Sequence, residues 1–192
     1  MGLDMYLSKI HIDALPYMEH DPEDTAKDNP DLYAEMKPHL HMQGTPDLYE
    51  WESLFQKVGY WRKANQIHNW FVNNVQEGED DCEDHEVTEE QLRELRDICI
   101  AVATQCVMVP GRISNGYTYE NNVMKPIMVK GKIILNPEVA QEMLPTQSGF
   151  FFGSTDYDEY YLKDVTNTIK IINDVLEQTD FSQYTIYYRA SW

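Results

Sequence analysis

Residues 60–71, YWRKANQIHNWF, are the stretch that decides the predicted fold, because their apolar side chains recur at helical spacing. At 100° per residue, one face of this helix would carry Tyr60, Ala64, Ile67, Phe71 and Val75. That face is widened on one side by Trp61, His68 and Val72. A polar strip borders it, made of Asn65 at the edge and of Arg62 and Asn69 beyond. We therefore expect a helix over residues 60–76, with His68 inside its apolar arc.

Two interpretations of this polar border are open. Either it lines a pocket, or His68 is an interior histidine whose hydrogen bonds serve the structure alone. A pocket would lie where the helix meets residues 153–158, because Ser154 and free amides at a helix start could hold an anionic group beside Arg62. Two acidic residues in that turn argue against an anion, and Ser154 or Asp156 could merely cap the helix. The candidate pocket residues are Arg62, Asn65, His68, Asn69, Ser154 and Tyr157.

Alternating apolar residues predict a strand at each end of the chain. At the start of the chain the alternating residues are Leu3, Met5 and Leu7, and at the end they are Tyr184, Ile186 and Tyr188. The glycine-bounded run Phe-Phe-Phe at 150–152 is typical of a central strand. Asn-Gly at 115–116 and Lys-Gly-Lys at 130–132 favour turns, so residues 111–132 suggest a β-hairpin-like excursion.

Further helices are indicated by apolar stripes. One stripe, ended by Gly59, consists of Leu48, Trp51, Phe55 and Val58. Thr88 and Gln91 form a capping box that opens a helix with the stripe Leu92, Leu95, Cys99, Val102 and Cys106. A last helix carries Tyr161, Val165, Ile169, Ile172 and Leu176. The predicted fold is therefore α+β: a mainly antiparallel sheet that includes both terminal strands, covered by three or four helices.

Length and charge limit the function classes. The chain of 192 residues fits a single domain, 1–192, that can bury a core of its own. Its 33 acidic and 15 basic residues give a formal charge of −18, which repels polyanions and excludes non-specific binding of nucleic acid. The same field favours docking onto a protein with a basic surface, although solubility alone would also account for the charge.

The cysteines and the N-terminus indicate a compartment. Cys99 and Cys106 lie seven residues apart on the expected helix, about 10 Å from each other, which is too far for a disulfide. An odd number of cysteines, three, fits a reducing cytosol. The opening MGLDMYLSKIHI alternates and has an early Asp4, so we expect neither a signal peptide nor a membrane span.

The segment 77–90, EGEDDCEDHEVTEE, contains nine carboxylates and no lysine or arginine. Cys82 and His85 could start a metal site, but a structural zinc site needs four ligands and no second pair with standard spacing follows. We expect neither a metal nor a cofactor here. A solvated acidic loop accounts for the segment, and the candidate interaction surface within it consists of Glu79, Asp80, Asp81, Glu83 and Asp84. The sequence carries no phosphate-binding loop, nucleophile elbow or Cys–His catalytic signature, so whether the protein is an enzyme stays open.

Several sequence blocks together resemble a family of small proteins encoded by bacteriophages and prophages, for which no reaction is established. They are MGLDMYL at 1–7, GYWRKANQIHNWFV at 59–72, GEDDC at 78–82, LPTQSGFFFGSTDYDEYY at 144–161, and the final Ser-Trp. The resemblance covers roughly a third of the chain and implies a phage-type accessory protein in the bacterial cytoplasm. It marks segments at about 13–46 and 108–135 as variable or inserted.

Two functions follow as expectations. The first is a non-enzymatic phage protein that binds and modulates a host protein, such as a defence or nucleic-acid-handling complex, through acidic surfaces. The second is a small-molecule site, enzymatic or sequestering, around Arg62, Asn65, His68 and Ser154.

Overall fold

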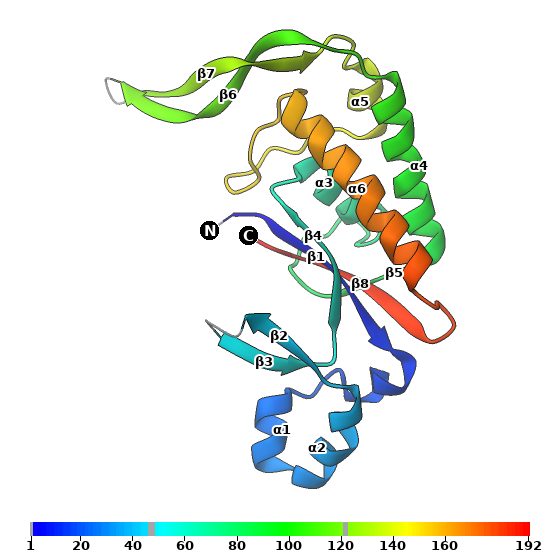
Figure 1. Cartoon of the computed structure of the whole chain (residues 1–192). Coiled ribbons are helices and arrows are strands. Elements are labelled where there is room, and N and C mark those ends of the chain that lie inside the picture. Colours follow the sequence, from blue (N-terminus) through cyan, green and yellow to red (C-terminus); the bar gives the residue numbers. More distant parts are fainter. Residues whose placement is uncertain (1, 46–48, 121–122) are drawn as a thin grey trace.

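The computed structural model describes residues 2–45, 49–120 and 123–192 and has an α+β architecture (Figure 1). Its strands are β1 (Asp4–His11), β2 (His41–Thr45), β3 (Tyr49–Ser53), β4 (Gln56–Arg62), β5 (His85–Val87), β6 (Met108–Glu120), β7 (Val123–Ile134) and β8 (Tyr184–Ser191). Its α-helices are α1 (Pro22–Asp28), α2 (Pro30–Met36), α3 (Asn65–Asn74), α4 (Glu89–Gln105), α5 (Glu138–Met143) and α6 (Glu159–Gln178). Two 3₁₀ turns, η1 (Ile12–Tyr17) and η2 (Lys37–His39), complete the list.

The main sheet has the strand order β4-β1-β8-β5, and all neighbouring strands in it are antiparallel. The first strand therefore lies in the middle, where Leu7 is paired with Gly59 on one side and with Tyr188 on the other. Alternation along β1 points Leu3, Met5 and Leu7 into the core, and all three are fully buried. Helices α3, α4 and α6 lie on this face of the sheet (Figure 1). The predicted fold class and both terminal strands are confirmed.

The two long helices form much as their sequences predict. Thr88 and Gln91 make the expected capping box at the start of α4, and Cys99 is buried on its inner face. Cys106 is the C-cap residue of α4 and is only partly buried, and the three cysteines are free. Burial raises the pKa of the Cys99 thiol to about 12, which keeps it protonated and unreactive.

A smaller lobe, formed by residues 12–45 and 49–54, packs against the end of the main sheet around a separate core. This core consists of Ile10, Ala14, Met36 and Leu54. The lobe contains the helix pair α1–α2 and the hairpin β2–β3 (Figure 1). Each helix starts with an acidic or amide cap followed by proline: the side chain of Asp21 accepts from the amide of Asp24, and that of Asn29 accepts from Leu32.

The expected hairpin at 111–132 is confirmed as the pair β6–β7, here called the arm. The turns predicted at 115–116 and 130–132 are wrong, because these residues lie within β6 and β7, the first at a shift of strand register. It extends well beyond the helices at the end of the molecule opposite the lobe (Figure 1). Its base joins the body: Ile113 and Ile134 are buried, and the amide of Ile134 donates to the carbonyl of Tyr157 at 3.0 Å.

Two predicted elements are wrong, the helix over 48–58 and the strand at 150–152, and a third begins later than predicted. The region expected to form a helix over 48–58 contains β3 and β4 instead, and its residue 48 lies outside the described part of the chain. The second helix begins at Asn65 rather than at 60, because Tyr60 to Arg62 belong to β4 and pair with β1. The run 150–152 is a loop and not a central strand: Phe150 is 96% exposed, and Phe151 supplies one carbonyl to the amide of Leu3.

Candidate functional site

Arg62 and Ser154 line a cavity of about 290 Å³ between the end of β4 and the start of α6. The other residues that line it are Lys63, Gln66, Gly153, Asp156, Asp158, Tyr160, Tyr161, Lys163 and Asp164. The Arg62 side chain is 60% exposed and reaches no closer than 4.0 Å to Asp4, so it remains available at the cavity mouth. The sequence therefore predicted two of the lining residues, but it placed Arg62 on a helix, whereas the structure has it at the end of strand β4.

The cavity combines cations with unusually placed carboxyl groups. Asp158, and not Ser154 or Asp156, caps α6, and its Oδ1 accepts from the amides of Tyr160 and Tyr161 at 2.8 and 3.2 Å. Its Oδ2 is buried without a hydrogen-bond partner among the described residues, and burial raises the pKa of this carboxyl. Burial also raises the pKa of Asp164 to about 6, against a hydrogen bond from Gln66 that lowers it. A ligand in this cavity would contact both basic and acidic side chains.

The other candidate pocket residues hold the loop 145–157 and do not line the cavity. The Nδ2 of Asn65 donates to the carbonyls of Phe152 and Ser154 at 3.1 and 2.8 Å, while its Oδ1 accepts from the amide of Gln147 at 3.0 Å. Asn69 donates to the carbonyl of Pro145 at 3.2 Å. The hydroxyl of Tyr157 accepts from the amide of Thr146 at 3.2 Å. These contacts satisfy the backbone of a long loop, which is a structural role.

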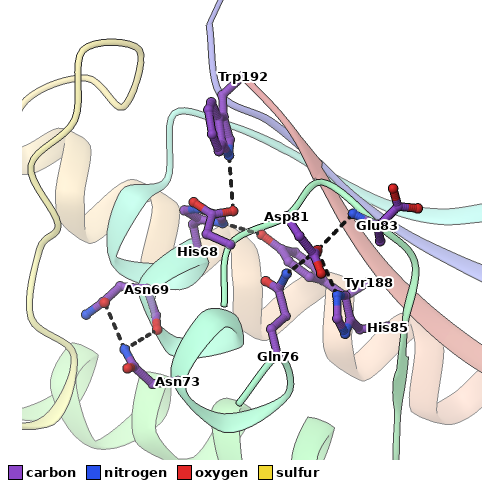
Figure 2. Close-up of polar contacts among 10 residues, drawn as sticks. His68, Asn69, Asn73, Gln76, Asp81, Glu83, His85, Tyr188 and Trp192 are labelled. Atoms are coloured by element: carbon purple, nitrogen blue, oxygen red, sulfur yellow. Dashed lines mark hydrogen bonds and ion pairs between the residues drawn. The ribbon is translucent and has the colours of Figure 1, made fainter. Parts of the chain in front are cut away.

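His68 is an interior histidine with a partner on each ring nitrogen (Figure 2). Its Nδ1 lies 2.8 Å from the hydroxyl of Tyr188, and its Nε2 lies 2.9 Å from Oδ2 of Asp80. The indole of Trp192 donates to the other oxygen of Asp80 at 3.1 Å. The imidazole is fully buried and packs edge-on against Phe152, with 5.0 Å between ring centroids. Because no face of the ring is open, these contacts favour the interior interpretation over the pocket.

The acidic segment 77–90 is pinned to the body more than its composition suggests. Beyond the pair of Asp80 with His68, Asp81 accepts from the amide of Glu83 and contacts His85 at 2.9 Å (Figure 2). These hydrogen bonds, first that of His85, lower the pKa of Asp81. The carboxylate of Asp84 lies 3.1 Å from Arg189. Of the five candidate surface residues, Glu79 and Glu83 are the two whose side chains are exposed and make no hydrogen bond or ion pair within the described chain.

No metal site emerges at Cys82 and His85. The residues placed by the structure contain no group of three or more His, Cys, Asp or Glu side chains arranged to hold a metal ion. His85 makes its contact with Asp81, and the Cys82 thiol is partly buried.

A second hollow, absent from the sequence prediction, lies between α1 and the β2–β3 hairpin. This acidic groove has a volume of about 630 Å³ and is lined by Asp21, Pro22, Glu23, Ala26, Lys27, Met42, Tyr49, Glu50, Trp51 and Glu52. Four carboxylates face a single lysine in it. Tyr49 and Trp51 stack with 5.8 Å between ring centroids and stay 65% and 45% exposed. The signal that could have found it is the acid excess of residues 13–52 together with Trp51, which the expected helix concealed.

Comparisons with known proteins add no relative: no family model, no curated protein and no solved structure matches this chain. Within the described ranges, none of the helices is both long enough and apolar enough to cross a membrane.

Proposed function

We propose that this protein is a phage-type accessory protein without catalytic function that binds a basic segment of a host protein in the acidic groove. The observation that supports the proposal is the composition of the groove, in which carboxylates surround exposed Met42, Tyr49 and Trp51. Lysine and arginine side chains can lay their aliphatic stems on such rings while their charged ends reach the carboxylates. Protein complexes that bind nucleic acid carry surfaces rich in lysine and arginine. A bacterial defence or nucleic-acid-handling complex is therefore the proposed target class.

The groove fits better than the segment 77–90 as the docking surface because exposed Met42, Tyr49 and Trp51 lie among its carboxylates. In both places most of the carboxylates have partners within the fold. Three of the five carboxylates proposed in that segment already have partners in the fold. In the groove, the side chain of Glu50 makes no ion pair or hydrogen bond among the described residues, and that of Glu23 pairs only with the exposed Lys27 at 2.9 Å. An exposed pair of this kind contributes little, so Glu23 can exchange its partner at small cost.

The test uses a short peptide in which lysine alternates with leucine, and its glutamate counterpart, titrated by calorimetry. The groove variant carries Glu23→Lys and Glu50→Lys, which spares Asp21 and Glu52 because they cap α1 and accept from Tyr33. Its matched control carries Glu79→Lys and Glu83→Lys, so both variants have a net charge of −14 instead of −18. We expect the groove variant to weaken binding of the lysine peptide by at least about tenfold and the control by less than about threefold.

The equal charge of the two variants separates contact from long-range attraction. If the control variant loses as much affinity as the groove variant, the general field of the protein accounts for binding and the groove is not the site. If only the control loses affinity, the segment 77–90 is the docking surface. Capture from a bacterial lysate with the wild type and the groove variant then identifies the host protein.

A second candidate function is a small-molecule site in the cavity beside Arg62, enzymatic or sequestering. The observation in its favour is the Oδ2 of Asp158, which is buried without a hydrogen-bond partner in the described part of the chain and lines the same cavity as the cations Arg62, Lys63 and Lys163. This arrangement fits a small ligand that carries both a cationic and an anionic group. Native mass spectrometry of the purified protein should show a retained ligand that Arg62→Ala releases and that the exposed control Arg93→Ala keeps. Equal retention by both variants would exclude this site.

A further inference from the structure

The arm is the part of the molecule that its fold leaves least covered. Large apolar side chains on it are exposed: Tyr117, Tyr119, Val123, Met124, Ile127 and Met128. Tyr119 is 75% exposed and is paired with Met124 across the hairpin. A two-stranded hairpin is only marginally stable in water by itself, and isolated apolar patches of this kind mark binding surfaces.

One face of the arm combines this apolar surface with positive charge. Cross-strand partners share a face, and residues two apart along a strand return to it. The face so defined contains Tyr119, Met124, Tyr117, Pro126 and Met128 towards the tip, and Arg112, Lys130 and Lys132 towards the base. Lys130 and Lys132 form no ion pair in the part of the chain that the structure describes. Arg112 and Lys130 are directly paired, and like charges so placed are unfavourable until an anionic group lies between them.

The arm differs in charge from the rest of the chain. Four basic residues and Glu120 give it a net charge of +3 on a protein of −18. The acidic groove has the opposite character, with exposed aromatic and methionine side chains among carboxylates. Arm and groove are thus complementary in charge and alike in apolar surface. They lie at opposite ends of the molecule (Figure 1), so the arm of one copy cannot fill its own groove.

We propose that the partner of the arm is a second copy of the chain: the arm of one molecule docks in the acidic groove of the next. The contact joins two different surfaces, so it is heterologous, and it generates open chains or rings instead of a closed dimer. Repulsion between two acidic bodies is screened beyond about 10 Å in about 0.1 M salt, whereas the arm and the groove meet at contact distance. The arm and a basic host segment would compete for the groove. The inference therefore rests on the proposed function for the location of the groove, but not for the identity of the host partner.

Charge exchange between the two surfaces provides the test. The arm variant carries Lys130→Glu and Lys132→Glu. The first change places a glutamate directly opposite Arg112, and this favourable pair of charges should preserve the hairpin structure. The groove variant carries Glu23→Lys and Glu50→Lys. Sedimentation measures the average mass at about 0.1–1 mM protein, a range in which even contacts with dissociation constants near 1 mM are detected. The wild type should rise above the monomer mass of 22.5 kDa as its concentration increases. Each variant alone should stay at that mass, and an equimolar mixture of the two should assemble again.

Matched controls carry the same changes of charge elsewhere. Lys163→Glu with Lys170→Glu on α6 matches the arm variant, and Glu79→Lys with Glu83→Lys matches the groove variant. Both controls should assemble with an affinity within about threefold of the wild type. Unchanged melting temperatures establish that all variants fold.

Three outcomes overturn the inference: a wild type that stays monomeric over the whole range, an arm variant that assembles as the wild type does, or a mixture that does not assemble. Its failure is distinct from that of the proposed function. A monomeric wild type that binds the lysine peptide removes self-docking and keeps the groove as a host site. Assembly that is restored by charge exchange, without binding of the peptide, supports self-docking and removes the host site.

Discussion

His68 and Asp80 form a hydrogen-bonded pair, with 2.9 Å between Nε2 and Oδ2, that fixes the acidic segment against helix α3. Tyr188 in the last strand holds the other ring nitrogen at 2.8 Å. We expect His68→Leu to lower the free energy of unfolding by about 1–3 kcal/mol, because the buried hydroxyl of Tyr188 loses its partner. Urea denaturation monitored by circular dichroism measures this difference.

The matched experiment removes both polar groups of the buried contact between His68 and Tyr188. When His68→Leu is combined with Tyr188→Phe, no unsatisfied polar group remains at either position, while the partly exposed Asp80 can turn to water and Trp192. The double variant should therefore be no less stable than His68→Leu alone, with a coupling energy of about 1 kcal/mol or more. Additive losses would show that the two side chains act independently.

How far the sequence predicted the fold depended on whether local pattern and tertiary pairing agreed. They agree at β1, β8, α4 and α6, where alternation or a helical stripe matches the buried face. They conflict at residues 48–58, whose apolar spacing resembles a helix. There β3 pairs with β2, and the residues from Gln56 on pair with β1, so strand pairing decides the conformation. Single-sequence periodicity has no access to these pairing partners.

The candidate site was predicted only in part, for a similar reason. Arg62 and Ser154 were predicted to meet and do line one cavity, because β4 and the start of α6 converge there. Asn65 and His68 fall on the buried side of α3 as the helical wheel requires, yet their hydrogen-bond partners come from a loop and a strand far along the chain. Residue type predicted that these groups would need partners, but it could not say whether a ligand or the protein would supply them.

Arg62→Ala should leave the fold intact. Its side chain is largely exposed, and its nearest carboxylate, that of Asp4, is 4.0 Å away, so the loss in unfolding free energy should stay below about 0.5 kcal/mol. Thermal melting of the variant beside the wild type checks this. A fall of several degrees would identify the arginine as a structural support, and the cavity would then lose its proposed cation.

Deletion of residues 3–7 should abolish cooperative melting. This segment is the middle strand between β4 and β8, and it buries Leu3, Met5 and Leu7 completely. Burial of each such side chain contributes about 1.5–3 kcal/mol, and their sum is comparable with the whole stability of a small domain. Calorimetry should show no folding transition. A sharp transition near the wild-type temperature would be incompatible with a central β1.

A metal chelator should not change the melting temperature. Cys82 and His85 lack two further ligands among the described residues, and no other group of three suitable side chains is found there. Cys82→Ser should likewise leave the melt within about 1 °C, since it removes no metal bond. If the chelator lowers the melting temperature by several degrees while Cys82→Ser abolishes that response, a metal site at this position has to be reconsidered.

Asp164 should make the protein less stable as the pH rises from about 4 to about 6. Burial raises the pKa of this carboxyl from 3.8 to about 6 in the folded protein, so in this window the folded state holds a proton that the unfolded state has released. Raising the pH removes that proton, and the free energy of unfolding falls by about 1–3 kcal/mol. Asp164→Asn should lose this dependence, so its advantage over the wild type should grow up to about pH 6 and then stay constant. Asp174→Asn on the same helix controls for the loss of a carboxylate, and denaturation midpoints over the pH range provide the measurement. A difference between Asp164→Asn and the wild type that does not change with pH would show that Asp164 ionises without cost in its place beside Gln66.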